Sequence, residues 1–282
     1  MWVFASSNLD AKLSYSLSSD HVKQGETAVL TVKSDQSIQG SATLLKRKFN
    51  LYAVDRFSKQ ATELKTFIAI DRRAKPGVYQ LKISVQEEDG DVYEFKLPVT
   101  IRDGEFRKEH IKLTKKKNNL VKGKKRLRNE NRRISSAYKH SEPFALFHGA
   151  FIMPVRKARI TAVFGNQRVY NGVPSWSHSG LDLGKHLGAP IRAANRGKVV
   201  LVGNFGVHGK TVIIDHGWKV FTIYNHLQTI YVQHNQVVSK GQSLGTMGAT
   251  GVATGPHLHW GVTVNGVRVN PLQWVKDPYL SL

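Results

Sequence analysis

The chain has 282 residues, a formal net charge of +22 at pH 7 and no cysteines. Its length predicts about two domains, each large enough for a hydrophobic core. The absence of cysteine excludes disulfide bonds and cysteine-ligated zinc. So strong a positive charge indicates attraction to a polyanion, which nucleic acid, an anionic membrane surface or a cell wall would each provide.

The N-terminal segment Met1–Ser7 is too short to be a signal peptide. We interpret it as the remainder of a sequence whose export signal has been removed. No apolar run approaches the roughly 20 residues that a transmembrane helix needs, so we expect no membrane span.

Residues 1–104 are expected to form an Ig-like β-sandwich, an accessory domain. Runs rich in β-branched and aromatic residues alternate with turn signals such as Lys75-Pro-Gly77, and short strands at this spacing are typical of a sandwich. No catalytic constellation is visible in this region, so we interpret it as a spacer or docking domain. The expected strands are Ala28–Val32, Phe67–Ile70, Tyr79–Val85 and Tyr93–Ile101.

Residues 105–143 form a basic connector, with dense runs at Lys115–Lys117 and Lys122–Arg126. We expect a solvated linker with one short helix over Asn129–His140. Aromatic residues do not alternate with the charges, which weakens an interpretation as a single-stranded nucleic-acid binder. The charges are expected to adsorb the protein to an anionic wall and to take no part in chemistry.

Residues 144–282 are predicted to be a second β-rich domain, because glycines interrupt a series of short apolar runs and helical periodicity is nearly absent. Asp215–Trp218 is typical of a hairpin turn. The expected strands are Lys198–Val202, Thr211–Asp215, Val220–Tyr224 and Val262–Val264.

Two histidines near the C-terminus carry the strongest chemical signal. His257 and His259 are separated by one leucine, behind a glycine-rich loop. On a strand, residues two apart point to the same face. Both imidazoles are therefore expected to project together, while Leu258 and Trp260 point to the opposite face.

Two further motifs lie upstream of this pair. His178-Ser-Gly-Leu-Asp182 offers an imidazole and a carboxylate, and Tyr224-Asn-His-Leu227 adds another histidine. Two imidazoles and one carboxylate are a typical ligand set for a catalytic zinc that keeps a fourth position for water. With these three motifs in this order, the sequence resembles the M23 metallopeptidases, the lysostaphin- and LytM-like peptidoglycan endopeptidases, over about residues 144–275.

The resemblance implies a zinc site of His178, Asp182 and His259 in a groove across a mostly antiparallel sheet, and it assigns His226 and His257 to catalysis. Zinc in this donor set remains a Lewis acid that activates water. The sequence has no His-Glu-x-x-His motif, so a histidine is expected to move the proton. We predict that His257 is the base and that His226 stabilises the oxyanion, although spacing alone permits the reverse.

The stretch Phe164–Gly172 resembles the equivalent stretch of M23 enzymes that have N-terminal regulatory domains. Arg168 is predicted to bind a carboxylate of the stem peptide, because a guanidinium matches that group. Asn171 is predicted to hydrogen-bond the substrate backbone. A salt bridge and a turn are the structural alternatives for these two residues.

The histidines outside the three motifs are expected to be surface or structural residues. Of these, His208 lies in a glycine-flanked loop that could line a groove. The set is His21, His110, His140, His148, His186, His208, His216 and His234.

Together, these features predict a periplasmic or secreted zinc endopeptidase that hydrolyses peptide crosslinks of bacterial peptidoglycan. The resemblance favours a D,D bond, with a glycyl-glycine bridge as the alternative substrate. A degenerate M23 binding module and a nucleic-acid-binding protein are the rival interpretations, but the five motif residues are intact and no helix-turn-helix or RNP motif is present. A regulatory partner is left open, and we expect the N-terminal domain or the connector to cover part of the groove.

Overall fold

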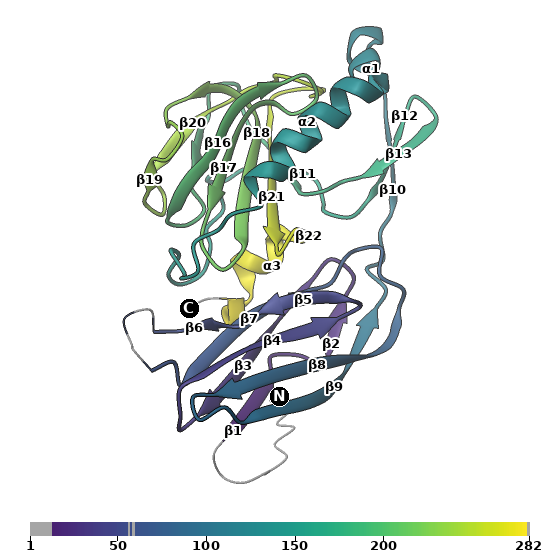
Figure 1. Cartoon of the computed structure of the whole chain (residues 1–282). Helices are drawn as coiled ribbons and strands as arrows, with labels where there is room; N and C mark the ends of the chain where they lie inside the picture. Colours follow the sequence, from purple (N-terminus) through teal and green to yellow (C-terminus); the bar gives the residue numbers. More distant parts are fainter. Residues whose placement is uncertain (1–12, 56, 58–59, 281–282) are drawn as a thin grey trace. The chain divides into compact units, whose positions relative to one another are not determined.

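The computed structural model describes residues 13–55, 57 and 60–280. These residues divide into two compact units, the first extending to Gly104 and including Pro143–Ala145, and the second containing Glu105–Glu142 and the chain from Leu146 onward. Both are built mostly from strands, in agreement with the predicted all-β class (Figure 1). The segment Met1–Ser7, interpreted above as the remainder of an export sequence, lies outside the described residues.

The first unit consists of two β-sheets. Its strands are β1 (Leu13–Leu17), β2 (His21–Lys23), β3 (Thr27–Ser34), β4 (Ile38–Leu44), β5 (Arg47–Asn50), β6 (Tyr52–Ala53), β7 (Glu63–Ala69), β8 (Gly77–Glu87) and β9 (Val92–Arg102). One sheet has the order β1-β3-β7-β6 and the other β2-β9-β8-β4-β5. Strand β7 contacts β4 and β5 of the other sheet, and side chains from both sheets, such as Leu30 and Ile83, are buried. This is the expected two-sheet arrangement.

The four strands predicted in this unit lie at β3, β7, β8 and β9, with ends shifted by a few residues. The additional strands are short or polar, and β5 shows why the sequence did not indicate them. Its sequence is Arg-Lys-Phe-Asn, and only Phe49 is buried. An edge strand with one inward apolar residue carries too little alternation to be recognised.

The connector segment, residues 105–142, belongs to the second unit. It contains β10 (Lys108–Ile111), α1 (Lys115–Lys122) and α2 (Lys124–Ala137). The prediction of a single helix starting at Asn129 is wrong, because lysine, arginine and leucine are good helix formers and extend α2 back to Gly123. The interpretation as a solvated linker is also wrong for part of the segment, since Leu113, Glu130 and Ile134 are buried. No helix in the described residues is long and apolar enough to cross a membrane.

The rest of the second unit is built on one large sheet. Its strands are β11 (Arg159–Ala162), β14 (Leu181–Gly184), β15 (Pro190–Arg192), β16 (Gly197–Phe205), β17 (Gly209–Asp215), β18 (Val220–Ile230), β19 (Val237–Val238), β20 (Ser243–Met247), β21 (His257–Val264) and β22 (Val267–Val269). The main order is β11-β14-β21-β18-β17-β16-β19, and neighbouring strands in this order are antiparallel. The four predicted strands lie within β16, β17, β18 and β21, and the predicted turn after Asp215 joins β17 to β18.

A smaller sheet joins the connector to the peptide that precedes His178. Strand β10 pairs in parallel with β12 (Gln167–Tyr170), which forms a hairpin with β13 (Val173–Ser177). At the C-terminal end of the described chain lie the short helix α3 (Pro271–Lys276) and the 3₁₀ turn η1 (Pro278–Leu280).

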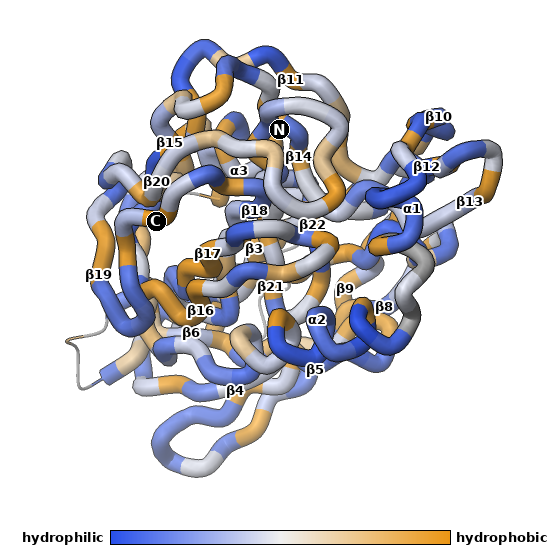
Figure 2. Tube along the Cα trace, turned by 90° about the horizontal axis from the view of Figure 1, so that it is seen from above, coloured by the Kyte–Doolittle hydropathy of each residue, from blue (hydrophilic) through white to orange (hydrophobic). Residues whose placement is uncertain are grey.

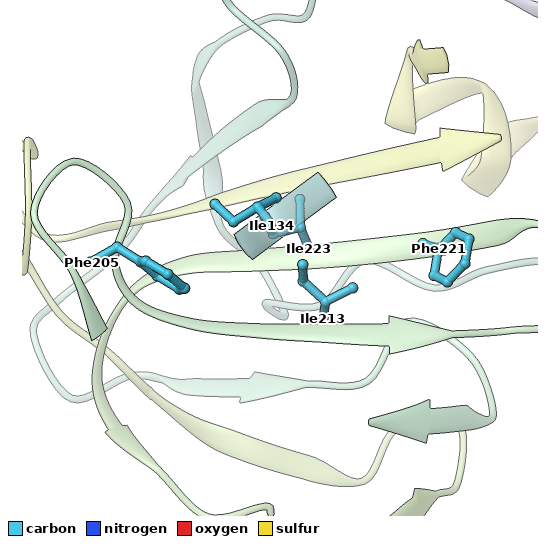
Figure 3. Packing of buried hydrophobic residues seen from close by; sticks show 5 residues of the cluster. All are labelled: Ile134, Phe205, Ile213, Phe221 and Ile223. Atoms are coloured by element: carbon cyan, nitrogen blue, oxygen red, sulfur yellow. The ribbon is translucent and has the colours of Figure 1, made fainter. Parts of the chain in front are cut away.

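Helix α2 packs on one face of the large sheet. Its Ile134 lies against Ile213 and Ile223 of β17 and β18, in a buried cluster that also contains Phe205 and Phe221 (Figure 3). The remaining surface of α2 is mostly hydrophilic, whereas β16 and β17 are rich in hydrophobic residues (Figure 2). In the pairing of β18 with β21, Ile223 is opposite Gly261 and Asn225 is opposite His259. Residues two apart on a strand share a face, so His259 lies on the same face of the sheet as Ile223. Ile223 packs against α2, and α2 therefore covers the face that carries His259.

Candidate metal centre and active site

The predicted metal ligands converge in the structure. Asp182 on β14 is directly opposite His259 on β21, and His178 lies just before β14. Oδ1 of Asp182 is 2.9 Å from Nε2 of His178 and 2.8 Å from Nδ1 of His259, and these two nitrogens are 2.9 Å apart. All three side chains are buried. The structure therefore brings together three residues that could hold one metal ion.

The hydrogen bonds around this cluster test whether it fits a cation. Nδ1 of His178 lies 2.7 Å from the carbonyl oxygen of Val163. A carbonyl only accepts, so Nδ1 carries the proton and Nε2 presents a lone pair to the carboxylate of Asp182. Lone pairs this close repel one another unless a proton or a metal ion lies between them. The donor set therefore fits a metal ion, and two nitrogens with one carboxylate oxygen suit zinc.

The electrostatics of the ligands point the same way. Burial alone would raise the pKa of Asp182, but its interactions with His178 and His259 bring that pKa well below its usual range. Burial lowers the pKa of His259 to about 3. An ionised carboxylate and a neutral imidazole are the forms that bind metal. The site thus keeps its ligands ready to coordinate at neutral pH.

The two predicted catalytic histidines lie beside this cluster. The ring centroids of His226 and His257 are 4.9 Å apart, and that of His226 is 6.3 Å from the ring of His259. Nδ1 of His226 is 2.7 Å from the carbonyl oxygen of Thr250, and Nδ1 of His257 is 2.9 Å from that of Gly255. Both Nδ1 atoms must therefore donate, which leaves an Nε2 lone pair on each ring. Burial, followed by the neighbouring His257 and His259, lowers the pKa of His226 well below its usual value, so this ring is neutral.

Arg168 and Asn171 have protein partners in the structure. The guanidinium of Arg168 forms an ion pair with Oδ2 of Asp182 and lies 3.8 Å from Glu109 of β10. Asn171 is in the β12–β13 turn with φ +48°, followed by Gly172 with φ +82°, a pair typical of a two-residue hairpin. Its side chain accepts from the N–H of Leu113 at 2.9 Å and donates to the carbonyl of the same residue at 3.2 Å. Contact of either residue with a substrate stays a prediction.

Two cavities border the cluster. The larger, of about 840 Å³, opens onto Asp182 and His257, and its walls include β10 and Arg159 of β11. The smaller, of about 50 Å³, is lined by residues that include His178, His226, His259 and His208. His208, which was considered above as a residue that could line a groove, lines this smaller cavity. Sequence reasoning missed the contribution of β10 to the wall of the larger cavity. Strand β10 pairs with β12, and 55 residues of the chain lie between the two strands, so no short motif marks this pairing.

Comparisons with known proteins agree with this geometry. A sequence profile described as peptidase family M23 matches residues 176–271, which include the three candidate metal ligands and both catalytic candidates. The matched segment contains β14 to β22 of the large sheet, where the cluster lies.

Named relatives resemble less than half of the chain. It is 37% identical over 125 residues to the DD-carboxypeptidase/endopeptidase Mpg of Neisseria meningitidis, covering 44% of this chain and 29% of the relative. It is also 37% identical over 118 residues to the peptidoglycan DD-endopeptidase ShyA of Vibrio cholerae, covering 42% of this chain and 27% of the relative. The chain therefore spans less than a third of the length of these curated relatives.

One solved structure resembles the chain beyond residues 176–271 as well. A putative peptidase M23 from Pseudomonas aeruginosa is 26% identical, has a TM-score of 0.63 and covers 93% of both chains. The likeness therefore includes strands of the first unit and the connector as well as residues 176–271.

Proposed function

We propose that this protein is a zinc-dependent endopeptidase that hydrolyses peptide crosslinks of bacterial peptidoglycan. The observation that carries the proposal is the convergence of His178, Asp182 and His259 beside a second pair of histidines. The M23 match of residues 176–271 supports peptidase chemistry at this place. The relatives named above as DD-endopeptidases support a D,D bond as the target.

The three metal-binding residues would hold zinc through His178 Nε2, His259 Nδ1 and the carboxylate of Asp182. When bound, zinc supplies Lewis acidity, which lowers the pKa of a water molecule and polarises a peptide carbonyl. Zinc cannot accept the proton that the attacking water loses. That task falls to groups of the chain.

His257 and His226 are the groups placed for proton transfer. Their Nδ1 atoms are engaged by carbonyl oxygens, so each ring has an Nε2 that can accept a proton from water. We propose His257 as the base, because it is on the same strand as the ligand His259 and its Nε2 lies 3.9 Å from Asp182. The neutral His226 would accept a second hydrogen bond from the water. A ring that has taken up a proton becomes a donor, which can stabilise the oxyanion and then protonate the leaving amine.

The larger cavity is the proposed site for the peptide. Its volume of about 840 Å³ is within the range of sites that enclose small ligands, and it opens beside both His257 and Asp182. Peptidoglycan lies outside the cytoplasm, so we propose that the protein acts in the periplasm or after secretion.

The test is incubation of the purified, zinc-loaded chain with crosslinked muropeptide dimers, followed by mass analysis. We expect monomers, with the cut at the D,D bond. Intact dimers alongside degraded casein would contradict the proposed substrate. Intact dimers that nevertheless bind would favour the rival function, an M23 domain that binds without cleaving.

A further inference from the structure

We propose that Glu130 of helix α2 is a positioning residue of the active site. It fixes the loop of residues 206–208, and through this loop it holds His226 and His208 in place. The inference rests on the proposed function, because it concerns the same site. With this role of Glu130, the connector contributes to the catalytic site, although the three sequence motifs all lie downstream of the connector.

Glu130 is directed into the protein. Residues 115–137 contain no other acidic residue, and the side chain of Glu130 is 9% exposed. Oε1 accepts from the N–H of Gly206 at 2.6 Å, and Oε2 accepts from the N–H of Val207 at 3.0 Å. A buried carboxylate that accepts two backbone N–H groups is a strong, geometrically specific anchor. A side chain at residue 206 would prevent this approach, because a Cβ there would lie 2.9 Å from Oε1.

The anchored loop contacts the catalytic histidine from its backbone side. The carbonyl of His208 accepts from the N–H of His226 at 3.0 Å. The carbonyl of Val207 accepts from the N–H of Val252 at 2.9 Å, two residues beyond the Thr250 carbonyl that holds the His226 ring. The loop therefore fixes both the backbone of His226 and the segment that orients its imidazole.

His226 needs such support because its backbone is strained. Its φ is +65°, a left-handed conformation that is unfavourable for an L-residue other than glycine. Conformations of this kind persist only where the surroundings enforce them. The contacts from residues 206–208 are among those that do so.

Helix α2 holds the loop at a second point. Phe205, next to Gly206, packs against Ile134 in the buried cluster (Figure 3), and the guanidinium of Arg133 lies 4.9 Å from the Phe205 ring centroid. His208 has its Nδ1 3.6 Å from Oε2 of Glu130, and it lines the small cavity with His226 and His259. Glu130 thus acts on the site through the loop and touches none of the metal-binding residues.

The experiment compares Glu130→Gln with the native zinc-loaded chain on a soluble crosslinked peptide dimer. Glutamine keeps the size of the side chain but loses the charge and one acceptor oxygen. We expect kcat to fall about 10- to 100-fold, as for a small displacement of a catalytic group, with zinc content unchanged and KM little altered. Gly206→Ala keeps the glutamate at residue 130 but should push the loop away from its carboxylate. This variant should therefore show the same loss of kcat.

The matched control is Tyr138→Leu, which loosens the C-terminal end of the same helix by removing the ring that packs against Phe221 and leaves the loop and its hydrogen bonds untouched. If it lowers kcat as much as Glu130→Gln does at an equal loss of thermal stability, Glu130 is merely structural and the proposal is overturned. An unchanged kcat in Glu130→Gln, or loss of its zinc, overturns it as well.

A readout independent of activity separates this inference from the proposed function. The nitrogen resonances of His226, measured by NMR in the zinc-loaded chain, report the hydrogen bond of its Nδ1. We expect them to shift in Glu130→Gln and to stay in Tyr138→Leu. If the native chain cleaves no dimer but this pattern holds, the substrate assignment fails and the positioning role stands. Unshifted resonances in Glu130→Gln remove the positioning role whatever the substrate.

Discussion

Arg168 holds the oxygen of Asp182 that does not face the metal-binding histidines. Oδ1 of Asp182 points to His178 and His259, whereas Oδ2 forms the ion pair with the guanidinium of Arg168. Arg168 is in turn 3.8 Å from Glu109. This arrangement fixes the carboxylate plane, so that Oδ1 stays directed at the two histidines.

Loss of this ion pair should weaken metal binding. Partners that orient a ligand typically contribute 10- to 100-fold to metal affinity, so we expect Arg168→Gln to lower zinc affinity by about that factor. Arg168→Lys, which keeps the charge but not the planar fork, should recover part of it. Competition with a chelator of known affinity measures the change. Unaltered affinity in Arg168→Gln would leave the predicted substrate contact as the role of Arg168.

The histidines should separate into two classes when zinc content is measured beside activity. His259→Ala removes a donor and is expected to lose zinc, activity and some stability, because bound metal stabilises the folded state. His257→Ala and His226→Ala should keep zinc and lose activity by roughly the 10²- to 10⁴-fold typical of acid–base groups. If His257→Ala emptied the site while His259→Ala stayed loaded, ligand and base would be assigned the wrong way round.

The arginine that lines the larger cavity predicts a preference for a substrate with a free carboxylate. The exposed Arg159 lines it near the metal-binding residues. We expect the native chain to bind a peptide with a free carboxylate about 10-fold more tightly than the same peptide amidated, in keeping with a hydrogen-bonded charge pair. Arg159→Gln should abolish this preference. Arg156→Gln makes the same charge change on an exposed residue outside the cavity and should preserve it, and equal KM values for both peptides in the native chain would contradict the prediction.

The exposed charges of the connector should act at a distance from the chemistry. Lys115, Lys116, Lys125 and Arg128 are exposed, whereas Lys117 donates to the carbonyl of Ala253 and has a structural contact. Replacing the four exposed residues with glutamine should weaken binding to isolated cell walls, and 1 M salt should do the same, because the Debye length then falls to about 3 Å. Turnover of a small soluble crosslinked peptide should stay nearly unchanged. A large loss on the soluble peptide would mean that the segment supports the site through these residues too.

How far the sequence predicted the site depends on how local each feature is. The alternation of His257 and His259 is set by strand geometry within three residues, and the structure has both on β21. The pairing of Asp182 with His259 depends on the register of two strands 77 residues apart in sequence, and only the resemblance to a known family indicated it. The burial of Glu130 could not be predicted from the sequence, because a single glutamate in a basic helix is normally interpreted as a surface residue. Its burial comes from the docking of α2 on the sheet, which no short-range pattern specifies.

His216 should make the stability of the second unit depend on pH. The ring is fully buried, with Nδ1 2.7 Å from the carbonyl of Arg196 and Nε2 2.8 Å from the hydroxyl of Thr222. Burial lowers its pKa from 6.5 to about 4. Above pH 6.5 the ring is neutral in both states. Between pH 6.5 and 4 the unfolded chain takes up a proton that the folded chain does not, so the free energy of unfolding falls as the pH is lowered and levels off below 4.

This shift corresponds to roughly 3 kcal/mol at about 1.4 kcal/mol per pKa unit. Urea unfolding at a series of pH values measures it, with His216→Gln as the comparison. Glutamine does not titrate and does not fill the space of the buried ring, so the variant should be less stable at pH 7 and lose less stability on acidification. Because the two proteins share all their other titratable groups, the informative quantity is the difference between the two pH profiles. If the difference does not change between pH 6.5 and 4, the buried ring of His216 is not the source of the acid sensitivity.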